Sequence, residues 1–132
     1  MIKMVKQKGG KKMNVLLIVG LCVICGVFGQ IFQKKGMNEI GQISIKELFS
    51  PKILNIVLQK YVFIGISFYI LASVLWLAAL SKGELSKIYP LIGTGYVFTA
   101  ILAWLFLGEK LTAMRIIGIL LISLGAYFTV LT

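Results

Sequence analysis

Residues 13–33 read MNVLLIVGLCVICGVFGQIFQ, a run of 21 positions without a charged side chain. A helix rises about 1.5 Å per residue, so such a run covers the roughly 30 Å of a bilayer's hydrocarbon core. Three more uncharged runs follow at 61–81, 88–108 and 116–132. All four are continuously apolar rather than alternating every second residue, which favours helices over barrel strands. The sequence therefore predicts an all-α integral membrane protein with four transmembrane helices.

The composition points the same way and excludes whole classes of function. Of 132 residues, 59% are hydrophobic and 14% charged, too apolar for an ordinary soluble domain. The chain has no His, no Asp, four Glu and one Arg. Because acid–base and metal-dependent mechanisms use these residue types, we expect no enzyme, no catalytic residue, no metal site and no cofactor. We expect a multi-pass protein of the cell membrane that acts in transport or membrane assembly.

The segments outside the spans are basic. Residues 1–12 hold five Lys and no periodic apolar pattern, which predicts a flexible arm before the transmembrane domain of residues 13–132. In the one long connection, Ser50 and Pro51 indicate a helix start, and the pattern that follows predicts an amphipathic helix over 51–59 in the interface. Alternatively, the second span begins at Pro51 and tilts.

Counting charges does not settle the orientation. Lys and Arg number seven on each side of a four-span topology, so the positive-inside rule returns a tie. Two topologies remain open. The protein has one orientation with the arm in the cytoplasm, or it inserts both ways and pairs antiparallel. The net charge of +10 does not indicate nucleic-acid binding, because the basic residues flank spans and no recognition motif accompanies them.

One polar face runs along the first span and includes Cys22, Gly26, Gly29, Gln30 and Gln33. An unpaired amide in hydrocarbon is costly, so Gln30 should face another helix or a polar cavity. Two interpretations are open: a hydrogen bond to a Ser or Tyr of a neighbouring helix, or contact with a substrate. Cys22 and Cys25 have C-x-x-C spacing, but in an apolar helix we expect them only to pack.

Aromatic residues share faces with small residues in the second and third spans. Such rings, with a polar atom, can line a pocket for an amphipathic ligand, although for Tyr89 we favour an interfacial belt, which needs no ligand. Either Ser86 caps the third helix, or Tyr89 and Pro90 mark a break that frees backbone groups for a substrate. The expected substrate path comprises Gln30, Gln33, Tyr69, Trp76, Tyr89, Gly93 and Tyr96.

Four glycines are expected at contacts between helices. They are Gly26 and Gly29 in the first span and Gly118 and Gly125 in the fourth, where the groove could hold another subunit or pack within the monomer. Four helices cannot enclose a polar passage of useful width, whereas eight can. We therefore expect a homodimer, or a heterodimer with a related subunit, surrounded by membrane lipids.

Four motifs, in this order and spacing, suggest a family. They are GQIFQKKG (29–36), LAALSKGELSKIYPL (77–91), LGEKL (107–111) and GILLISLG (118–125). Together they resemble the drug/metabolite transporter superfamily in its EamA-like, small four-helix form, over most of residues 13–132. The resemblance implies a bundle like that of the small multidrug resistance proteins.

Two branches of that superfamily carry different implications. The small multidrug resistance type exports hydrophobic cations using a Glu in the first helix, and no Glu lies within a span here. The chain is also similar to the paired subunits of aminoarabinose-phosphoundecaprenol flippases. That similarity implies movement of a polyprenyl-phosphate-linked sugar, with Lys34, Lys35 and Lys87 as contacts for phosphate or headgroup. A cation exporter and a non-transporting subunit of a partner complex remain the alternatives.

Overall fold

A computed structural model describes residues 9–131, with side chains from residue 14 onward. This part of the chain is built from helices: α1 (Gly9–Ile40), α2 (Ile45–Leu48), α3 (Lys52–Leu58), α4 (Lys60–Leu80), α5 (Leu85–Ile92), α6 (Gly95–Leu107) and α7 (Ala113–Leu131). Four stretches are long and apolar enough to cross a membrane: Asn14–Ile40, Lys60–Leu80, Leu85–Leu107 and Ala113–Leu131. The predicted all-α fold with four transmembrane helices is confirmed.

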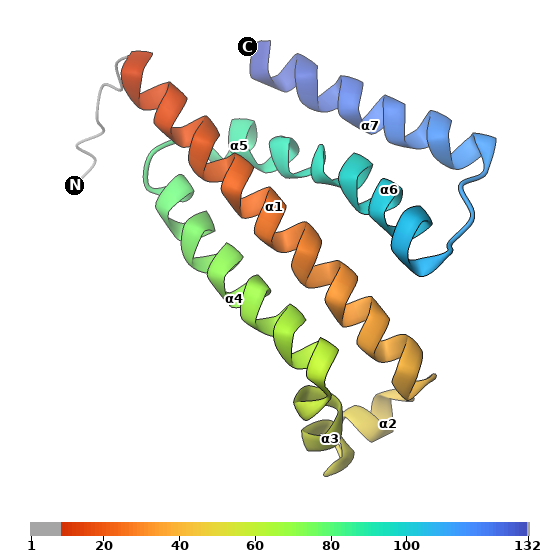
Figure 1. The fold of residues 1–132 in the computed structure, drawn as a ribbon. Helices are drawn as coiled ribbons and strands as arrows, with labels where there is room; N and C mark the ends of the chain where they lie inside the picture. The colour runs from red at the N-terminus through yellow and green to blue at the C-terminus, as the bar shows by residue number, and fades with distance from the viewer. Residues whose placement is uncertain (1–8, 132) are drawn as a thin grey trace.

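Helices α1 and α4 form the main antiparallel pair (Figure 1). Their backbones meet at Gly29 and Gly65, where neither residue places a side chain between the helices. At the far end of the pair, Val15 and Val19 pack with Ala79 and Ile88 in a small buried core. This pairing fixes α1 as the central helix, because α5 and α6 also pack against it.

The third span is α5 followed directly by α6, with a tightened turn between them. Pro90 lacks the N–H that would continue the α-helical ladder, and Gly93, Thr94, Tyr96 and Val97 all donate to the carbonyl three residues back. This is the hydrogen bonding of a 3₁₀ turn. Helix α5 runs through Tyr89 and Pro90, so the predicted break at these two residues is wrong, and the span is interrupted instead at Gly93 and Thr94.

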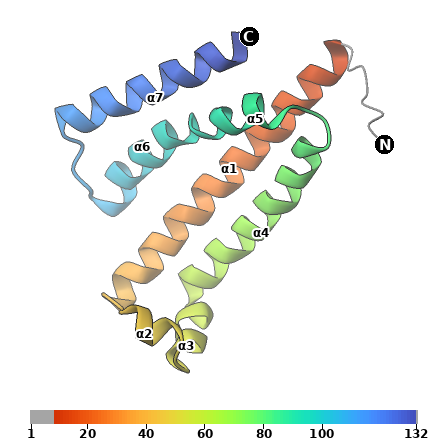
Figure 2. The same cartoon turned by 180° about the vertical axis from the view of Figure 1, so that it is seen from behind.

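Among the described helices, α7 packs mainly onto the third span. It follows Gly108, whose φ of +69° ends α6 in the left-handed region, and it runs back along α6 and α5. In both views α7 lies apart from α4 (Figures 1 and 2). Much of its surface has no partner within the described chain.

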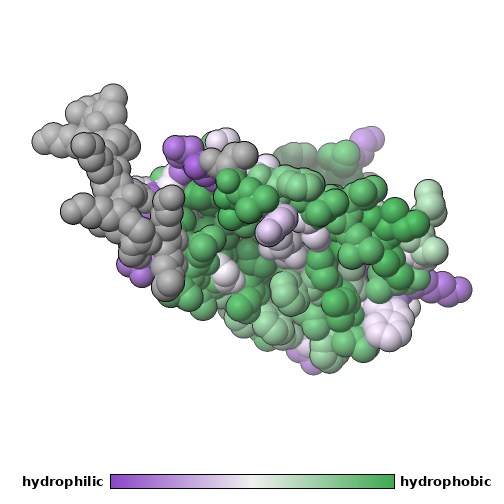
Figure 3. Space-filling view, turned by 90° about the horizontal axis from the view of Figure 1, so that it is seen from above, coloured by the Kyte–Doolittle hydropathy of each residue, from purple (hydrophilic) through white to green (hydrophobic). Residues whose placement is uncertain are grey.

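The outer surface is apolar over the spans. Large hydrophobic side chains are exposed on all four of them, and the face seen in Figure 3 is hydrophobic almost throughout, with hydrophilic residues at its margins. A protein in water rarely exposes so large a continuous apolar surface. The distribution is that of a multi-pass integral membrane protein, with lipid as the solvent of the spans.

Several local predictions differ from the structure. Residues 1–8 of the predicted flexible arm (1–12) lie outside the described residues. Residues 9–12 of that arm belong to α1. Helix α1 also continues past the predicted end of the first span to Ile40, since leaving the hydrocarbon does not end a helix. Ser86 is not the cap of the third span, because it lies inside α5. That helix starts at Leu85, and its N-cap residue is Glu84. The predicted helix over 51–59 corresponds to α3.

Candidate functional site

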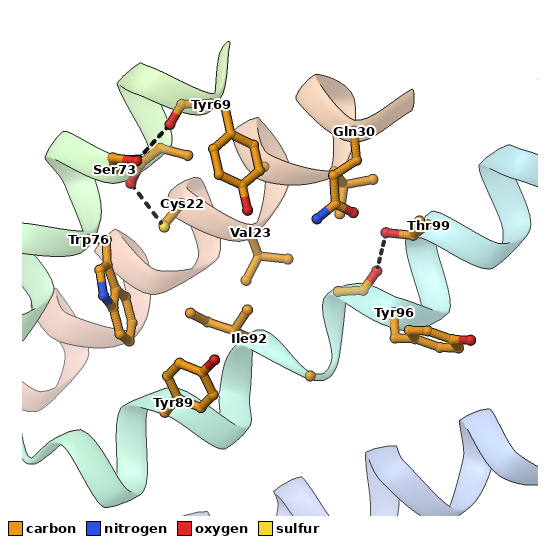
Figure 4. Close-up of a pocket in the computed structure, with 15 residues that line it drawn as sticks. Cys22, Val23, Gln30, Tyr69, Ser73, Trp76, Tyr89, Ile92, Tyr96 and Thr99 are labelled. Carbon is orange, nitrogen blue, oxygen red and sulfur yellow. Dashed lines mark hydrogen bonds between the residues drawn. The ribbon is translucent and has the colours of Figure 1, made fainter. Parts of the chain in front are cut away.

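A cavity of about 370 Å³ opens between α1, α4 and the α5–α6 span. Figure 4 shows its lining side chains converging from these helices. Six of the seven residues predicted for a substrate path line it: Gln30, Tyr69, Trp76, Tyr89, Gly93 and Tyr96. The remaining wall is formed by Cys22, Val23, Gly26, Val27, Ala72, Ser73, Ile92, Gly95 and Thr99. The structure thus brings together residues that lie up to 77 positions apart, between Cys22 and Thr99.

Small residues create the hollow. A Cβ on Gly26 would meet no atom within 4 Å, so this predicted packing residue faces open space in the cavity instead. Ala72 keeps the α4 wall thin, and Gly95 lets α6 approach α1 so closely that a Cβ there would lie 2.8 Å from Val23 Cγ1. The cavity is therefore wide beside Gly26 and narrow beside Val23.

Aromatic rings make the rest of the wall and leave it open on one side. Trp76 and Tyr89 meet edge to face with ring centroids 6.0 Å apart, a favoured aromatic geometry. Tyr69, Tyr89 and Tyr96 remain 45%, 63% and 53% exposed. A ligand would therefore find ring faces on several sides and an opening on one side of the cavity.

The polar atoms of the cavity fall into two groups. The hydroxyls of Ser73 and Thr99 donate to carbonyls of their own helices, each at 2.9 Å, and the Cys22 thiol donates to the Ala72 carbonyl at 3.2 Å. These groups need no ligand.

The second group has no hydrogen-bond partner anywhere in residues 14–131. It comprises the Gln30 amide, the indole N–H of Trp76 and the hydroxyls of Tyr69, Tyr89 and Tyr96. Polar groups at membrane depth are costly unless they are paired. One interpretation of Gln30 is a hydrogen bond to a neighbouring helix. The described residues contain no such bond.

None of the described residues that line the cavity carries a charged side chain. Glu84 caps α5 and Glu109 follows α6, while Glu39 and Glu47 lie near the α1–α2 connection. The cavity therefore offers neutral hydrogen-bonding groups and ring faces. Such a surface suits a neutral, hydroxyl-rich or amphipathic group, with cation–π attraction available to a positive one.

Gln33 does not line the cavity. Its Cγ lies 2.7 Å from the position of a Cβ on Gly65, so Gln33 packs between α1 and α4. Gln30 and Gln33 are three positions apart on α1. The rotation about the helix axis over these positions directs Gln33 towards α4 and Gln30 into the cavity. Gly29 lies at the α1–α4 contact, as the packing prediction had it.

The predicted phosphate-contact lysines are exposed and lie at two different ends of the molecule. Lys34 and Lys35 are at the end of α1 beside the start of α4, and Lys87 is in the first turn of α5 beside the opposite end of α1. Gly118 and Gly125 on α7 have nothing within 4 Å of a Cβ position. Neither glycine is a site of close packing against the described residues.

Sequence reasoning did not single out several residues of this region. Val23, Ser73 and Thr99 line the cavity, and Gly36 lets Gln59 and Val62 pack onto α1. Ser73 and Thr99 share helical faces with Trp76 and Tyr96, respectively, so this spacing could have found them. Gly36 gives no such signal, because its role depends on which helix lies against it.

Comparison with known proteins places the chain in a family. The family of EamA-like transporters matches residues 42–131. The probable 4-amino-4-deoxy-L-arabinose-phosphoundecaprenol flippase subunit ArnF of Proteus mirabilis is 38% identical over 103 residues, covering 74% of this chain and 77% of that protein. An uncharacterized protein of Methanocaldococcus jannaschii is 40% identical over 100 residues, covering 72% of each chain.

A second flippase subunit extends the match over more of the chain. The probable 4-amino-4-deoxy-L-arabinose-phosphoundecaprenol flippase subunit ArnE of Yersinia pseudotuberculosis is 28% identical over 113 residues, covering 86% of this chain and 93% of that protein. No solved structure matches the chain. With four transmembrane helices and a family match over most of its length, the chain belongs to the EamA-like transporter family.

Proposed function

We propose that this protein is a flippase subunit that moves an amphipathic, polyprenyl-phosphate-linked substrate across the membrane, with the headgroup passing through the cavity while the chain stays in lipid. The observation that carries this proposal is the set of unpaired neutral polar groups around Gln30, Tyr69 and Tyr96 at membrane depth. A sugar headgroup supplies hydroxyls for these groups and a face for ring stacking. The names of the two flippase-subunit relatives support the substrate class.

The proposal includes pairing with a second chain, either another copy or a related subunit. Helix α7 is the contact surface, since Gly118 and Gly125 leave open space along it. A cavity that is open on one side needs a second wall to form a passage. Two chains supply eight transmembrane helices, enough to enclose a headgroup.

A multidrug exporter is the second candidate, and the aromatic lining of the cavity is the observation that favours it. Trp76 and Tyr89 could hold a hydrophobic cation by cation–π attraction. Among the described residues, no carboxylate lines the cavity, which leaves a proton-coupled cation exporter without a carboxylate or imidazole at the site. Neutral hydrogen-bonding groups therefore favour the lipid-linked substrate.

The experiment is a flipping assay in liposomes, performed with the purified protein and with any second chain that purifies with it. A fluorescent polyprenyl-phosphate-linked amino sugar and a membrane-impermeant quencher report movement of the headgroup. We expect Gln30→Leu to slow flipping about fivefold, because loss of a hydrogen bond made during passage is worth about 1 kcal/mol. Asn38→Leu is the matched control, since Asn38 is an exposed amide on α1 outside the cavity.

Each alternative has a distinct result in the same experiment. If no lipid-linked phosphate is flipped and hydrophobic cations bind saturably, the protein is a cation exporter. If neither substrate class is bound or moved, the protein is a non-transporting subunit. Equal flipping by the wild type and Gln30→Leu would show that the headgroup does not pass this cavity.

A further inference from the structure

Two lysines from different helices meet on one aromatic ring. The Lys35 ammonium of α1 lies 4.6 Å from the centroid of Tyr61, and the Lys60 ammonium of α4 lies 4.9 Å from the same centroid. Both lysines are exposed. The ring holds the two positive charges at one place by cation–π attraction, at the end of the α1–α4 pair that borders α3 (Figure 1).

These charges have no carboxylate partner in the part of the chain that the structure describes. Its one ion pair joins Lys52 and Glu47 at 3.5 Å. Glu39, the acidic residue nearest in the sequence to Lys35, accepts a hydrogen bond from Gln59 Nε2 at 2.7 Å. The start of α4 adds the partial positive charge of a helix N-terminus. An anion at this position would therefore relieve repulsion between two ammonium groups.

A column of stacked rings leads from this charged position towards the middle of the membrane. Phe32 stacks on Tyr61 with centroids 6.5 Å apart and on Phe68 with centroids 5.9 Å apart. Phe28 follows, 6.3 Å from Phe68, and is 42% exposed. The column offers an apolar track for a hydrocarbon chain directly below the two ammonium groups.

The column is separate from the cavity. Phe28 lies two residues from both Gly26 and Gln30, a rotation of about 200° around the helix, and none of the four rings lines the cavity. The α1–α4 pair thus carries the cavity on one side and the ring column on the other.

From these observations we propose that Lys35, Lys60 and Tyr61 bind the phosphate group of a membrane lipid, whose hydrocarbon chain lies along Phe32, Phe68 and Phe28. The lysines supply charge and hydrogen bonds to the phosphate oxygens. The apolar track makes the ligand a lipid rather than free phosphate. This site needs no transport step and stands independently of the proposed function.

The test is native mass spectrometry of the full-length protein in detergent, with four probes added separately. These are undecaprenyl phosphate, phosphatidylglycerol, undecaprenol and inorganic phosphate. We expect at least one phosphate lipid to bind, and the tighter of the two identifies the source of the phosphate. Lys35→Gln and Lys60→Gln should each weaken that binding about fivefold, since one basic residue near anionic lipid is worth about that factor.

Matched variants separate a specific effect of this site from an effect of general charge. Lys110→Gln removes a lysine from the connection between α6 and α7 and should leave binding unchanged. Lys35→Arg combined with Lys60→Arg keeps both charges and should retain most of the binding. Because the altered lysines are exposed, folding of the Gln variants can be verified by their unchanged melting temperatures.

Three results would overturn the proposal. One is equal binding of the phosphate lipid to the wild type and to the Lys35→Gln, Lys60→Gln double variant. Another is undecaprenol binding as tightly as the tighter of the two phosphate lipids. A third is inorganic phosphate binding as tightly as that lipid. None of these results depends on whether the protein flips its substrate.

Discussion

The carbonyl oxygen of Gly29 lies 2.6 Å from the position that a Cβ on Gly65 would occupy, and a Cβ on Gly29 would lie 2.9 Å from the carbonyl oxygen of Gly65. The backbones of α1 and α4 touch at this point. Small residues allow such close approach, and in a membrane the packing it permits is a main source of helix association. This contact fixes how α1 and α4 pair. One side of that pair forms a wall of the cavity.

Gly65→Ala should destabilise the protein because its methyl group has no room between α1 and α4. Overpacking of this kind costs about 1–3 kcal/mol, and the melting temperature in detergent should fall accordingly. Gly20→Ala is the control, since a Cβ at Gly20 meets nothing within 4 Å. A Gly65→Ala protein as stable as the wild type would mean that α1 and α4 do not touch here.

Gln30→Leu should leave the melting temperature unchanged or slightly raised. The Gln30 amide makes no hydrogen bond within residues 14–131, so its removal breaks no internal contact and removes a polar group from the membrane. Thermal unfolding in detergent measures this directly. A loss of more than about 1 kcal/mol would instead identify Gln30 as a residue that holds helices or subunits together.

Tyr69→Phe and Tyr96→Phe should slow flipping of the lipid-linked sugar without changing the fold. Each removes one unpaired hydroxyl from the cavity, and a hydrogen bond made during passage is worth about 0.5–1.5 kcal/mol, or roughly two- to tenfold in rate. The matched control is Tyr127→Phe, because Tyr127 is exposed on α7 away from the cavity. Equal rates in all three variants would exclude contact between these hydroxyls and the substrate.

Gly125→Leu should break the pairing of two chains while leaving each chain folded. No described residue lies within 4 Å of a Cβ at Gly125, so a large side chain there would clash with a second subunit seated on this face and not with the described monomer. Light scattering of the detergent-purified protein reports the mass of the protein part. Gly20→Leu, at an equally open position on α1, should keep the wild-type mass. A Gly125→Leu protein that stays paired would place the contact on another surface.

Hydropathy and helical spacing were sufficient to predict the four spans and much of the cavity lining. The apolar runs report directly which residues lie in lipid, and a period of 3.6 residues reports which of them share a face. Gln30, Tyr69 and Tyr96 could be selected because a polar atom in an apolar helix needs a partner. That argument depends on local sequence alone.

Features set by neighbouring helices could not be predicted in the same way. Gln33 was grouped with Gln30 because the two share a broad polar face, but α4 lies against one edge of that face and the cavity against the other. Gly26 resembled a packing glycine and instead faces open space. The meeting of Lys35 and Lys60 on Tyr61 also needs the register between α1 and α4, which the sequence does not contain.

The most direct test of the cavity as the substrate path is the reactivity of Gly26→Cys. In a Cys22→Ser, Cys25→Ala background, a small charged thiol reagent should label Gly26→Cys, and saturating polyprenyl-phosphate-linked sugar should slow that labelling. Ile24→Cys, exposed on the other side of α1 and off the cavity, should not be labelled, because lipid excludes a charged reagent. Labelling of Gly26→Cys that the lipid-linked sugar leaves unchanged, or no labelling at all, would contradict the account.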